Sequence, residues 1–328
     1  MFPDPIEPVH PESRVDLLLE KMSRTGFQGR KLGEAYAVWK QMIADPGITI
    51  LAGLSGAMIP AGMQECLIEL IEHRFIDVIV STGANIFHDV CEHCGIRHYM
   101  GHHHVDDLEL FHQGIDRIYD VFAYEEQFRG IDSMVAGFAS QNEGFSGSSS
   151  NFVRILGEWL CRLYPGGRSL VGSAARLNVP IFVPAFSDSS LGIALVMAGR
   201  KGVKISIDQL ADADELTRIV ENAKKTGVIY IGGGVPKNFI QQTQVIASIH
   251  DQGCGGHDYA VQFTTDTPHF GGLSGCTFEE AISWGKESED CRKVQCFCDA
   301  TIALPLVSSA LISSGIVRNH VSSSDIKG

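Results

Sequence analysis

With 328 residues and 44% hydrophobic side chains, the chain is long enough for one large α/β domain or two smaller ones, which excludes disorder over most of its length. The formal net charge of −13 disfavours nucleic acid and anionic membrane as partners and leaves room for a cationic substrate. No apolar run reaches the roughly 18 residues of a membrane span, no secretory signal opens the chain, and nine scattered cysteines do not resemble a disulfide framework, so we expect a cytoplasmic protein.

The first 46 residues predict a helical arm. Apolar residues recur at helical spacing over residues 14–22 and 33–43, and Thr25–Gly29 separates the two segments. From Ile48 onward, short β-branched runs alternate with helical segments. The expected strands are 48–52, 78–80, 181–184, 203–205, 228–231, 260–263 and 294–297, and the expected helices include 63–73, 152–162, 191–199, 208–225, 239–249 and 301–312.

This alternation predicts one catalytic α/β domain over residues 47–328, with a Rossmann-like parallel sheet covered by helices on both faces. The polar segment 141–150 predicts a loop that moves, and the tail after Asn319 predicts a frayed end.

Small and polar residues follow most of the expected strands, at 53–58, 81–85, 188–190, 232–234, 264–266 and 299–300. Ligands of open parallel sheets bind at the carboxyl ends of the strands, so this pattern favours a nucleotide lying across the sheet edge. None of these segments forms G-x-G-x-x-G, and glycines at strand ends also serve plain turns. Both interpretations stay open at this level.

Cys91-Glu92-His93-Cys94, with His98 and His102–His104 nearby, is the clearest metal-like pattern. No second C-x-x-C pair follows, and three adjacent histidines cannot all face one point, so buried thiols with a polar rim are the favoured interpretation over zinc. We therefore expect no metal. His88 and Asp89 are a candidate acid/base pair, although a histidine near a helix start is more often structural.

Two lysines lie beside glycine turns. Lys237 follows Gly232–Gly234, where its ordinary role is a surface charge at a helix start. Lys286 follows a short helix that the capping-box spacing of Thr277 and Glu280 predicts to start at Phe278, and Gly285 lies where that helix stops. A lysine there is usually a solvated surface group. To act as an amine nucleophile, Lys286 needs apolar burial by Trp284, Ile282 and Phe278.

Several segments together resemble the deoxyhypusine synthase family, and most closely its deoxyhypusine synthase-like members. They are 25–28, 76–82, 114–119, 231–237, 258–261 and, most specific, Glu280-Ala281-Ile282-Ser283-Trp284-Gly285-Lys286. The similarity runs from about Val15 to Ile312, nearly the whole chain.

The resemblance implies NAD-dependent transfer of an aminobutyl or related aminoalkyl group, with Lys286 as the imine-forming lysine. It places NAD contacts on Gly56, Ala57, Met58, Thr82, Gly83, Asp188, Gly233, Gly234, Thr265, Asp266, Asp299 and Ala300. It also implies a homotetramer with active sites at subunit interfaces.

The substrate positions depart from the family pattern. Where the family holds polyamine amines with three carboxylates and a histidine, this chain has His88, Ile193, Asn238 and Leu273. Trp284 and Glu280 remain as cation contacts. We therefore expect the transfer chemistry with a changed amine, for example to form homospermidine. Deoxyhypusine synthesis on a translation-factor lysine, and amine oxidation by NAD without transfer, are the alternatives.

Overall fold

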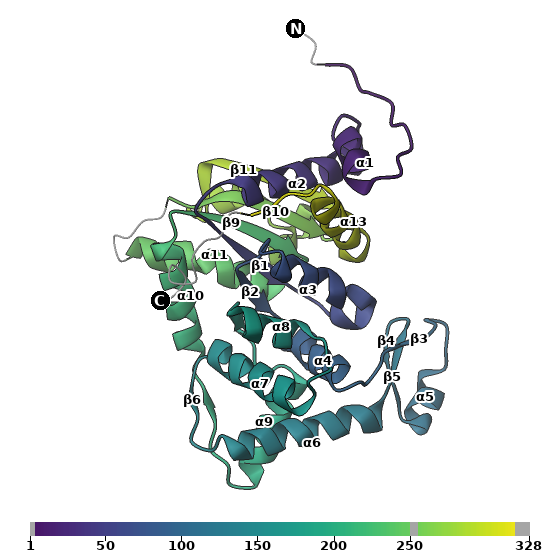
Figure 1. The fold of residues 1–328 in the computed structure, drawn as a ribbon, viewed down its shortest axis with the longest axis vertical. Helices are drawn as coiled ribbons and strands as arrows, with labels where there is room; N and C mark the ends of the chain where they lie inside the picture. Colours follow the sequence, from purple (N-terminus) through teal and green to yellow (C-terminus); the bar gives the residue numbers. More distant parts are fainter. Residues whose placement is uncertain (1–3, 250–254, 319–328) are drawn as a thin grey trace. The chain divides into compact units, whose positions relative to one another are not determined.

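The structure is a computed structural model that describes residues 4–249 and 255–318 (Figure 1). The predicted frayed tail after Asn319 lies outside the described residues. The chain divides into two compact units, each treated separately below. The first contains residues up to 55, residues 69–80 and residues from 213 onward, and the second contains residues 56–68 and 81–212. The boundary at residue 46 between a helical arm and a catalytic domain stays a prediction.

The main sheet confirms the predicted α/β fold. Its strands are β1 (Ile48–Leu54), β2 (Val78–Ser81), β7 (Ile181–Phe182), β9 (Lys225–Ile231), β10 (His257–Thr264) and β11 (Glu287–Phe297), in the order β11-β10-β9-β1-β2-β7. The pairs β1–β9, β9–β10 and β10–β11 are parallel. Strand β1 is buried along its whole length, as expected of a strand covered on both faces.

In the first unit, helices α1 (Val15–Met22), α2 (Phe27–Ala44) and α13 (Ala300–Ser313) pack on one another, and α2 also packs on β10 and β11 (Figure 1). Helix α11 (Gly234–Ile249) packs on β1. Trp39 and Met42 of α2 are fully buried. Gly227 in β9 makes room for this helix, because a Cβ atom there would lie 2.6 Å from the Met42 sulfur. The remaining helices that touch this unit are α3 (Gln64–Glu72, after a π-helical turn at Ile59–Met63), α10 (Gln209–Asn222) and α12 (Phe278–Ile282).

The second unit is mostly helical. It contains α4 (Gly83–His93), α5 (Asp107–Gln113), α6 (Glu125–Gln141), α7 (Ser149–Leu163), α8 (Leu170–Leu177) and α9 (Ser190–Arg200). The sequence did not predict its antiparallel sheet β3-β5-β4, made of Tyr99–Met100, Val121–Tyr124 and Ile115–Ile118. These strands are two to four residues long and only partly buried, so they carry little periodic signal.

Two sequence-based element assignments are wrong, and a third has a misplaced end. Residues 203–205 form no strand. Instead, the adjacent β8 (Ser206–Ile207) pairs with β6 (Ser146–Gly147) in a separate two-stranded sheet. The helix predicted over 208–225 stops at Asn222, because Lys225 already begins β9. Phe27–Gly29, expected between two helices, form the first turn of α2.

The second half of segment 141–150, predicted as a polar loop, instead forms β6 and the start of α7. Ser148 accepts a hydrogen bond from the Asn151 N–H and caps α7. The Ser149 hydroxyl accepts from Val183 N at 2.7 Å, and the Ser149 N–H donates to Asp212 at 2.8 Å. All three serines from 148 to 150 are buried, so their polar groups form hydrogen bonds within the protein and not with solvent.

Arg318, the last described residue, joins the starts of two central strands. Its guanidinium donates to both carboxylate oxygens of Asp77 at 2.9 and 2.8 Å, and to the carbonyls of Arg74 and Ile48. Asp77 also accepts from the Ile50 N–H at 2.8 Å. Both side chains are buried, so each charge depends on the other for its partner. Among the helices described, none is both long and apolar enough to cross a bilayer.

Candidate active site

In the first unit, parallel strands bring three groups of predicted cofactor residues to one edge. Ile231 is paired with Phe263, and Thr264 with Phe297, so β9, β10 and β11 end side by side. The Gly232 N–H donates to the Phe263 carbonyl at 2.8 Å across this edge. Immediately beyond these ends lie the predicted pairs Gly233 and Gly234, Thr265 and Asp266, and Asp299 and Ala300.

The glycine turn after β9 is shaped by a close approach of another loop. Gly232 and Gly234 have φ values of +80° and +57°, which favour glycine. A Cβ atom on Gly233 would lie 2.5 Å from the Cα atom of Ser274. The Gly234 N–H donates to the Ser274 hydroxyl at 2.9 Å, and the Ser55 hydroxyl donates to the Gly233 carbonyl. The sequence did not single out Ser55 or Ser274, since a lone serine in a loop carries no pattern.

In the second unit, the remaining predicted cofactor residues gather at two helix starts. The Gly56 carbonyl accepts from the Thr82 hydroxyl at 2.8 Å, and Thr82 caps α4. A Cβ atom on Gly83 would lie 2.4 Å from the Ser189 hydroxyl oxygen, and Ser189 caps α9. The positive ends of α4 and α9 therefore lie close together, an arrangement that suits a phosphate. Ala57 and Met58 lead into the π-helical turn, and Asp188 is exposed directly before Ser189.

The helix predicted before Lys286 is confirmed. Thr277 caps α12 by accepting from the Glu280 N–H at 3.1 Å. Gly285 has φ +67°, and the Lys286 N–H donates to the Ala281 carbonyl at 3.1 Å, so the chain turns sharply out of the helix. Nothing lies within 4 Å of a Cβ atom built on Gly285, so glycine is needed here for its backbone angle.

The Lys286 side chain is half-buried and meets two of the predicted substrate residues. Its Nζ donates to Asn238 Oδ1 at 3.2 Å and lies 5.6 Å from the centre of the Trp284 ring. Trp284 keeps 67% of its surface exposed, and Glu280 is also exposed. Phe278, expected to help bury Lys286, instead has its ring 5.5 Å from the Nζ of Lys237.

Lys237 is buried, so its assignment as a surface charge is wrong. It has no exposed surface, and its Nζ donates to Gln262 Oε1 at 2.9 Å and to the Cys276 carbonyl at 2.7 Å. The Tyr230 ring lies 5.8 Å away. Burial lowers the pKa of Lys237. Gln262, a polar residue between the apolar residues Val261 and Phe263 of β10, was the sequence signal that could have revealed this buried network.

We expect Lys237→Met to lower the free energy of unfolding by about 1–3 kcal/mol, because methionine fills similar space but removes a buried hydrogen bond to Gln262 and another to the Cys276 carbonyl, leaving each with Gln295 as its remaining donor. Urea unfolding followed by circular dichroism measures this loss. Lys224→Met, at an exposed lysine of the same unit, is the matched control. An unchanged midpoint for Lys237→Met would mean that the ammonium contributes nothing to the fold.

A buried carboxyl directly follows the candidate nucleophile, and its burial could not be predicted from the sequence. Glu287 is 2% exposed, and its Oε1 accepts from Gln241 Nε2 at 2.8 Å. Its other oxygen has no hydrogen-bond partner in the part of the chain that the structure describes. Burial raises the pKa of Glu287 to about 7.

In the second unit, a cavity of about 470 Å³ contains two of the altered substrate positions, His88 and Ile193. Its lining combines acceptor groups with apolar walls: Ala84, Phe87, His88, Asp116, Ile118, Phe128, Ser187, Asp188, Ser189, Ser190 and Ile193. Carboxylates, hydroxyls and aliphatic or aromatic surface together suit an alkyl amine.

His88 and Asp89 do not form an acid/base pair. Asp89 is fully buried, accepts from the N–H groups of Leu170 and Val171 at 2.9 and 2.8 Å, and thereby holds the start of α8. Burial raises the pKa of Asp89 to about 6. His88, one residue earlier on α4, lines the cavity instead. The two side chains thus serve different partners.

The cysteine and histidine side chains near residue 91 have different partners and do not converge on one point. Cys91 is buried, and burial raises the pKa of its thiol. His93 bonds the Ser169 hydroxyl at 2.6 Å, whereas His98 bonds Glu92 at 2.7 Å. Over residues 4–249 and 255–318, no three His, Cys, Asp or Glu side chains are grouped so as to hold a metal ion.

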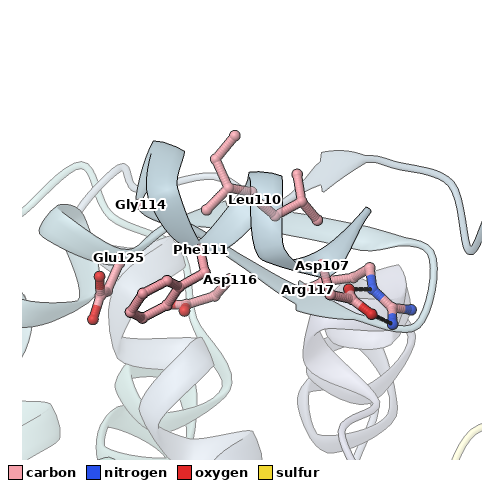
Figure 2. Close-up of a pocket in the computed structure, with 8 residues that line it drawn as sticks. Asp107, Leu110, Phe111, Gly114, Asp116, Arg117 and Glu125 are labelled. Carbon is pink, nitrogen blue, oxygen red and sulfur yellow. Dashed lines mark hydrogen bonds and ion pairs between the residues drawn. The ribbon is translucent and has the colours of Figure 1, made fainter. Parts of the chain in front are cut away.

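A second hollow in this unit lies between α5 and the β4–β5 hairpin and holds none of the predicted site residues (Figure 2). Figure 2 shows the Asp107–Arg117 ion pair at one end, with two hydrogen bonds of 2.5 and 2.8 Å. Phe111, Asp116 and Glu125 lie at the other end. Because Arg117 and Asp107 are paired with each other at its exposed end, we assign this hollow no catalytic or binding role.

Comparison with known proteins places these features in a family context. The sequence model described as deoxyhypusine synthase matches residues 17–311. A protein named probable deoxyhypusine synthase 2 from Methanosarcina acetivorans is 54% identical over 309 residues, covering 94% of this chain and 90% of that protein. Its namesake from Archaeoglobus fulgidus is 56% identical over 292 residues, covering 89% and 96%. The fold resembles the crystal structure of a candidate deoxyhypusine synthase from Entamoeba histolytica, with a TM-score of 0.64, 20% identity, and coverage of 94% and 95%.

Proposed function

Because the chain belongs to the deoxyhypusine synthase family, we propose that it is an NAD-dependent transferase that moves an aminobutyl or related aminoalkyl group from a polyamine to an acceptor amine. The observation that carries the proposal is the placement of Lys286. Its Nζ lies at the end of a capped helix, is half-buried, and is held by Asn238 Oδ1 beside the Trp284 ring. Lys286 is the residue we assign to imine formation with the transferred carbon fragment.

The surrounding side chains position this amine and its partner. Asn238 accepts one of the Lys286 N–H hydrogens and so fixes the direction of Nζ. The exposed face of Trp284 is available to a substrate ammonium by a cation–π contact, and the exposed carboxylate of Glu280 lies on the same short helix. We propose both as substrate contacts, with a second protein copy covering the exposed Trp284 ring.

We propose NAD as the cofactor, contacted by the predicted strand-end residues. The glycine turn after β9 and the paired helix starts at Thr82 and Ser189 fit the backbone approach and anionic groups of a dinucleotide. NAD bound there would supply the two-electron acceptor that oxidation of an amine needs and, once reduced, the hydride donor that makes the overall transfer redox-neutral.

The amine is proposed to differ from the family's usual polyamine. His88, Ile193, Asn238 and Leu273 stand where the family has three carboxylates and a histidine, so fewer negative charges meet the substrate. Homospermidine is one product that this change permits. Transfer to a lysine of a translation factor is the second candidate, favoured by relatives of 54–56% identity that are named probable deoxyhypusine synthase 2. Oxidation of an amine by NAD without transfer is a third outcome that the same experiment separates.

We also propose self-association as a homotetramer. Large apolar side chains are exposed around the β3-β5-β4 sheet, among them Met100, Phe111 and Tyr119. Exposed apolar groups in one region are typical of a protein interface, and a second copy of the chain is the partner that family membership favours. The proposed cytoplasmic location agrees with these assignments.

A panel of amines incubated with the protein and NAD tests this function. Product masses should show an alkyl amine fragment moved from one amine to another, without net accumulation of NADH, because the transfer is redox-neutral. Stoichiometric NADH with no new adduct would instead establish oxidation alone. Absence of both products across the small amines, but labelling of a translation-factor lysine, would establish the second candidate.

A further inference from the structure

Three side chains behind the cavity wall of the second unit form a hydrogen-bonded chain. His98 Nδ1 lies 2.7 Å from Glu92 Oε1, and His98 Nε2 lies 2.9 Å from His88 Nδ1. Glu92 and His88 lie one turn apart on α4, and His98 follows in the loop after that helix. Only His88 of the three lines the cavity.

The rings are held in place by aromatic packing. The centre of the Phe128 ring lies 5.3 Å from that of His88 and 5.9 Å from that of His98, and Phe87 lies 5.5 Å from His88. Both imidazoles are nearly buried, with 9% of His88 and 6% of the His98 side chain exposed. Neither ring can therefore exchange its hydrogen-bond partner for water without disturbing this packing.

The charge of Glu92 sets the direction of the chain. Burial by itself raises the pKa of Glu92, but hydrogen bonds from His98 and Arg97 outweigh it and lower the pKa overall. A carboxylate only accepts hydrogen bonds, so His98 carries a hydrogen on Nδ1. With His98 neutral, its Nε2 is an acceptor, and His88 must donate from Nδ1. The lone pair of His88 is then on Nε2.

From this geometry we infer that His98 is neutral, and that Glu92 and His98 are positioning residues that hold His88 as a neutral acceptor, through Nε2, for the N–H of a primary or secondary alkyl ammonium in the cavity. The inference rests on the proposed function and specifies how that enzyme recognises its amine. His88 Nε2 has no hydrogen-bond partner among the residues described.

The other charged groups facing His88 agree with a cationic ligand. Asp116 and Asp188 line the same cavity, and Ile193 and Phe128 supply apolar wall for a methylene chain. Burial lowers the pKa of His88 to about 4, so the imidazole does not repel an ammonium at neutral pH. The neutral imidazole of His88 thus stands where the resemblance places a carboxylate. The site therefore presents one negative charge fewer to a bound ammonium.

The tautomer of His88 can be tested without turnover. In protein labelled with ¹⁵N-histidine, long-range ¹H–¹⁵N spectra should show His88 with a protonated Nδ1 and a pyridine-like Nε2 at pH 7. His98→Phe keeps the ring packing but removes the acceptor for His88 Nδ1, so the fixed tautomer should be lost. A protonated Nε2 on wild-type His88, or an unchanged His88 spectrum in His98→Phe, would overturn the inference.

Amine affinity gives the second readout, with 1,4-diaminobutane as the probe in calorimetry. We expect His98→Phe and Glu92→Gln to weaken binding about tenfold, the lower end for loss of an outer-shell partner. Arg97→Gln is the matched control, because it removes the exposed second partner of Glu92 and leaves the chain to His88 intact. Equal affinity of wild type and His98→Phe would contradict the role of the chain. A wild type that binds the diamine but transfers nothing would count against the proposed function only.

Discussion

Lys286→Ala is expected to lower amine-dependent product formation by on the order of 10⁴-fold or more, the scale seen when a covalent nucleophile is removed. Lys237, which directly precedes Asn238, is fully buried and bonded to Gln262 and Cys276, so it is not free to replace the lost amine. NAD affinity should stay close to that of the wild type, because the strand-end residues proposed for NAD do not include Lys286.

Product masses measured in single-turnover reactions, with NAD affinity measured separately, check this expectation. Borohydride added during turnover should fix the carbon fragment to Lys286, and peptide mass mapping should find the adduct there. Lys224→Ala controls for loss of an exposed lysine in the same unit. Full activity of Lys286→Ala, or a borohydride adduct on a different lysine, would rule out Lys286 as the imine-forming residue.

Glu287→Gln is expected to change how stability depends on pH. Burial raises the pKa of Glu287 from 4.5 to about 7, so the folded protein favours the protonated carboxyl. The stabilisation from that proton is complete below pH 4.5 and is lost as the pH rises through 7. The shift corresponds to about 3 kcal/mol, and glutamine, which has no proton to lose, should retain the stability at pH 8.

Urea unfolding of both proteins across pH 4.5–8, at equal protein concentration, measures this difference. Relative to the wild type, Glu287→Gln should gain stability steadily as the pH rises, because all other groups titrate equally in the two proteins. Glu289→Gln, at an exposed carboxylate of the same strand, should show no such trend. The opposite trend would mean that Glu287 is charged in the fold and paired with Lys237 or Lys286.

The parts of the fold with strong periodicity could be predicted from the sequence. Continuous apolar runs such as Ile48–Leu54 have few other uses than a buried parallel strand, and the Thr277–Glu280 spacing was enough to start α12. The short strands β3, β4 and β5 could not be found, because a strand of two to four residues that are mostly exposed or half-buried has no repeating pattern.

The candidate site was predicted where a local motif exists and missed where contacts are long-range. Glycine turns and the Trp284–Lys286 segment were visible in sequence order. The burial of Lys237 depends on Gln262, 25 residues away, and that of Glu287 depends on Gln241, 46 residues away. Such pairs can be identified only once the topology that brings β9, β10 and β11 together is known. The sequence alone does not distinguish a buried charged residue from an exposed one.

The hydrogen bonds of Arg318 to Asp77, Arg74 and Ile48 limit the order in which the chain can fold as it is synthesised. Strand β1 is made early, but its partner β9 starts at Lys225, and the arginine that joins Ile48 to Asp77 comes 241 residues after that aspartate. The second unit ends at Asp212, so its residues have all been made before β9 exists. We therefore expect the second unit to become compact during synthesis. The first unit should stay incompletely folded, with the apolar faces of its strands uncovered, until the end of the chain has been made.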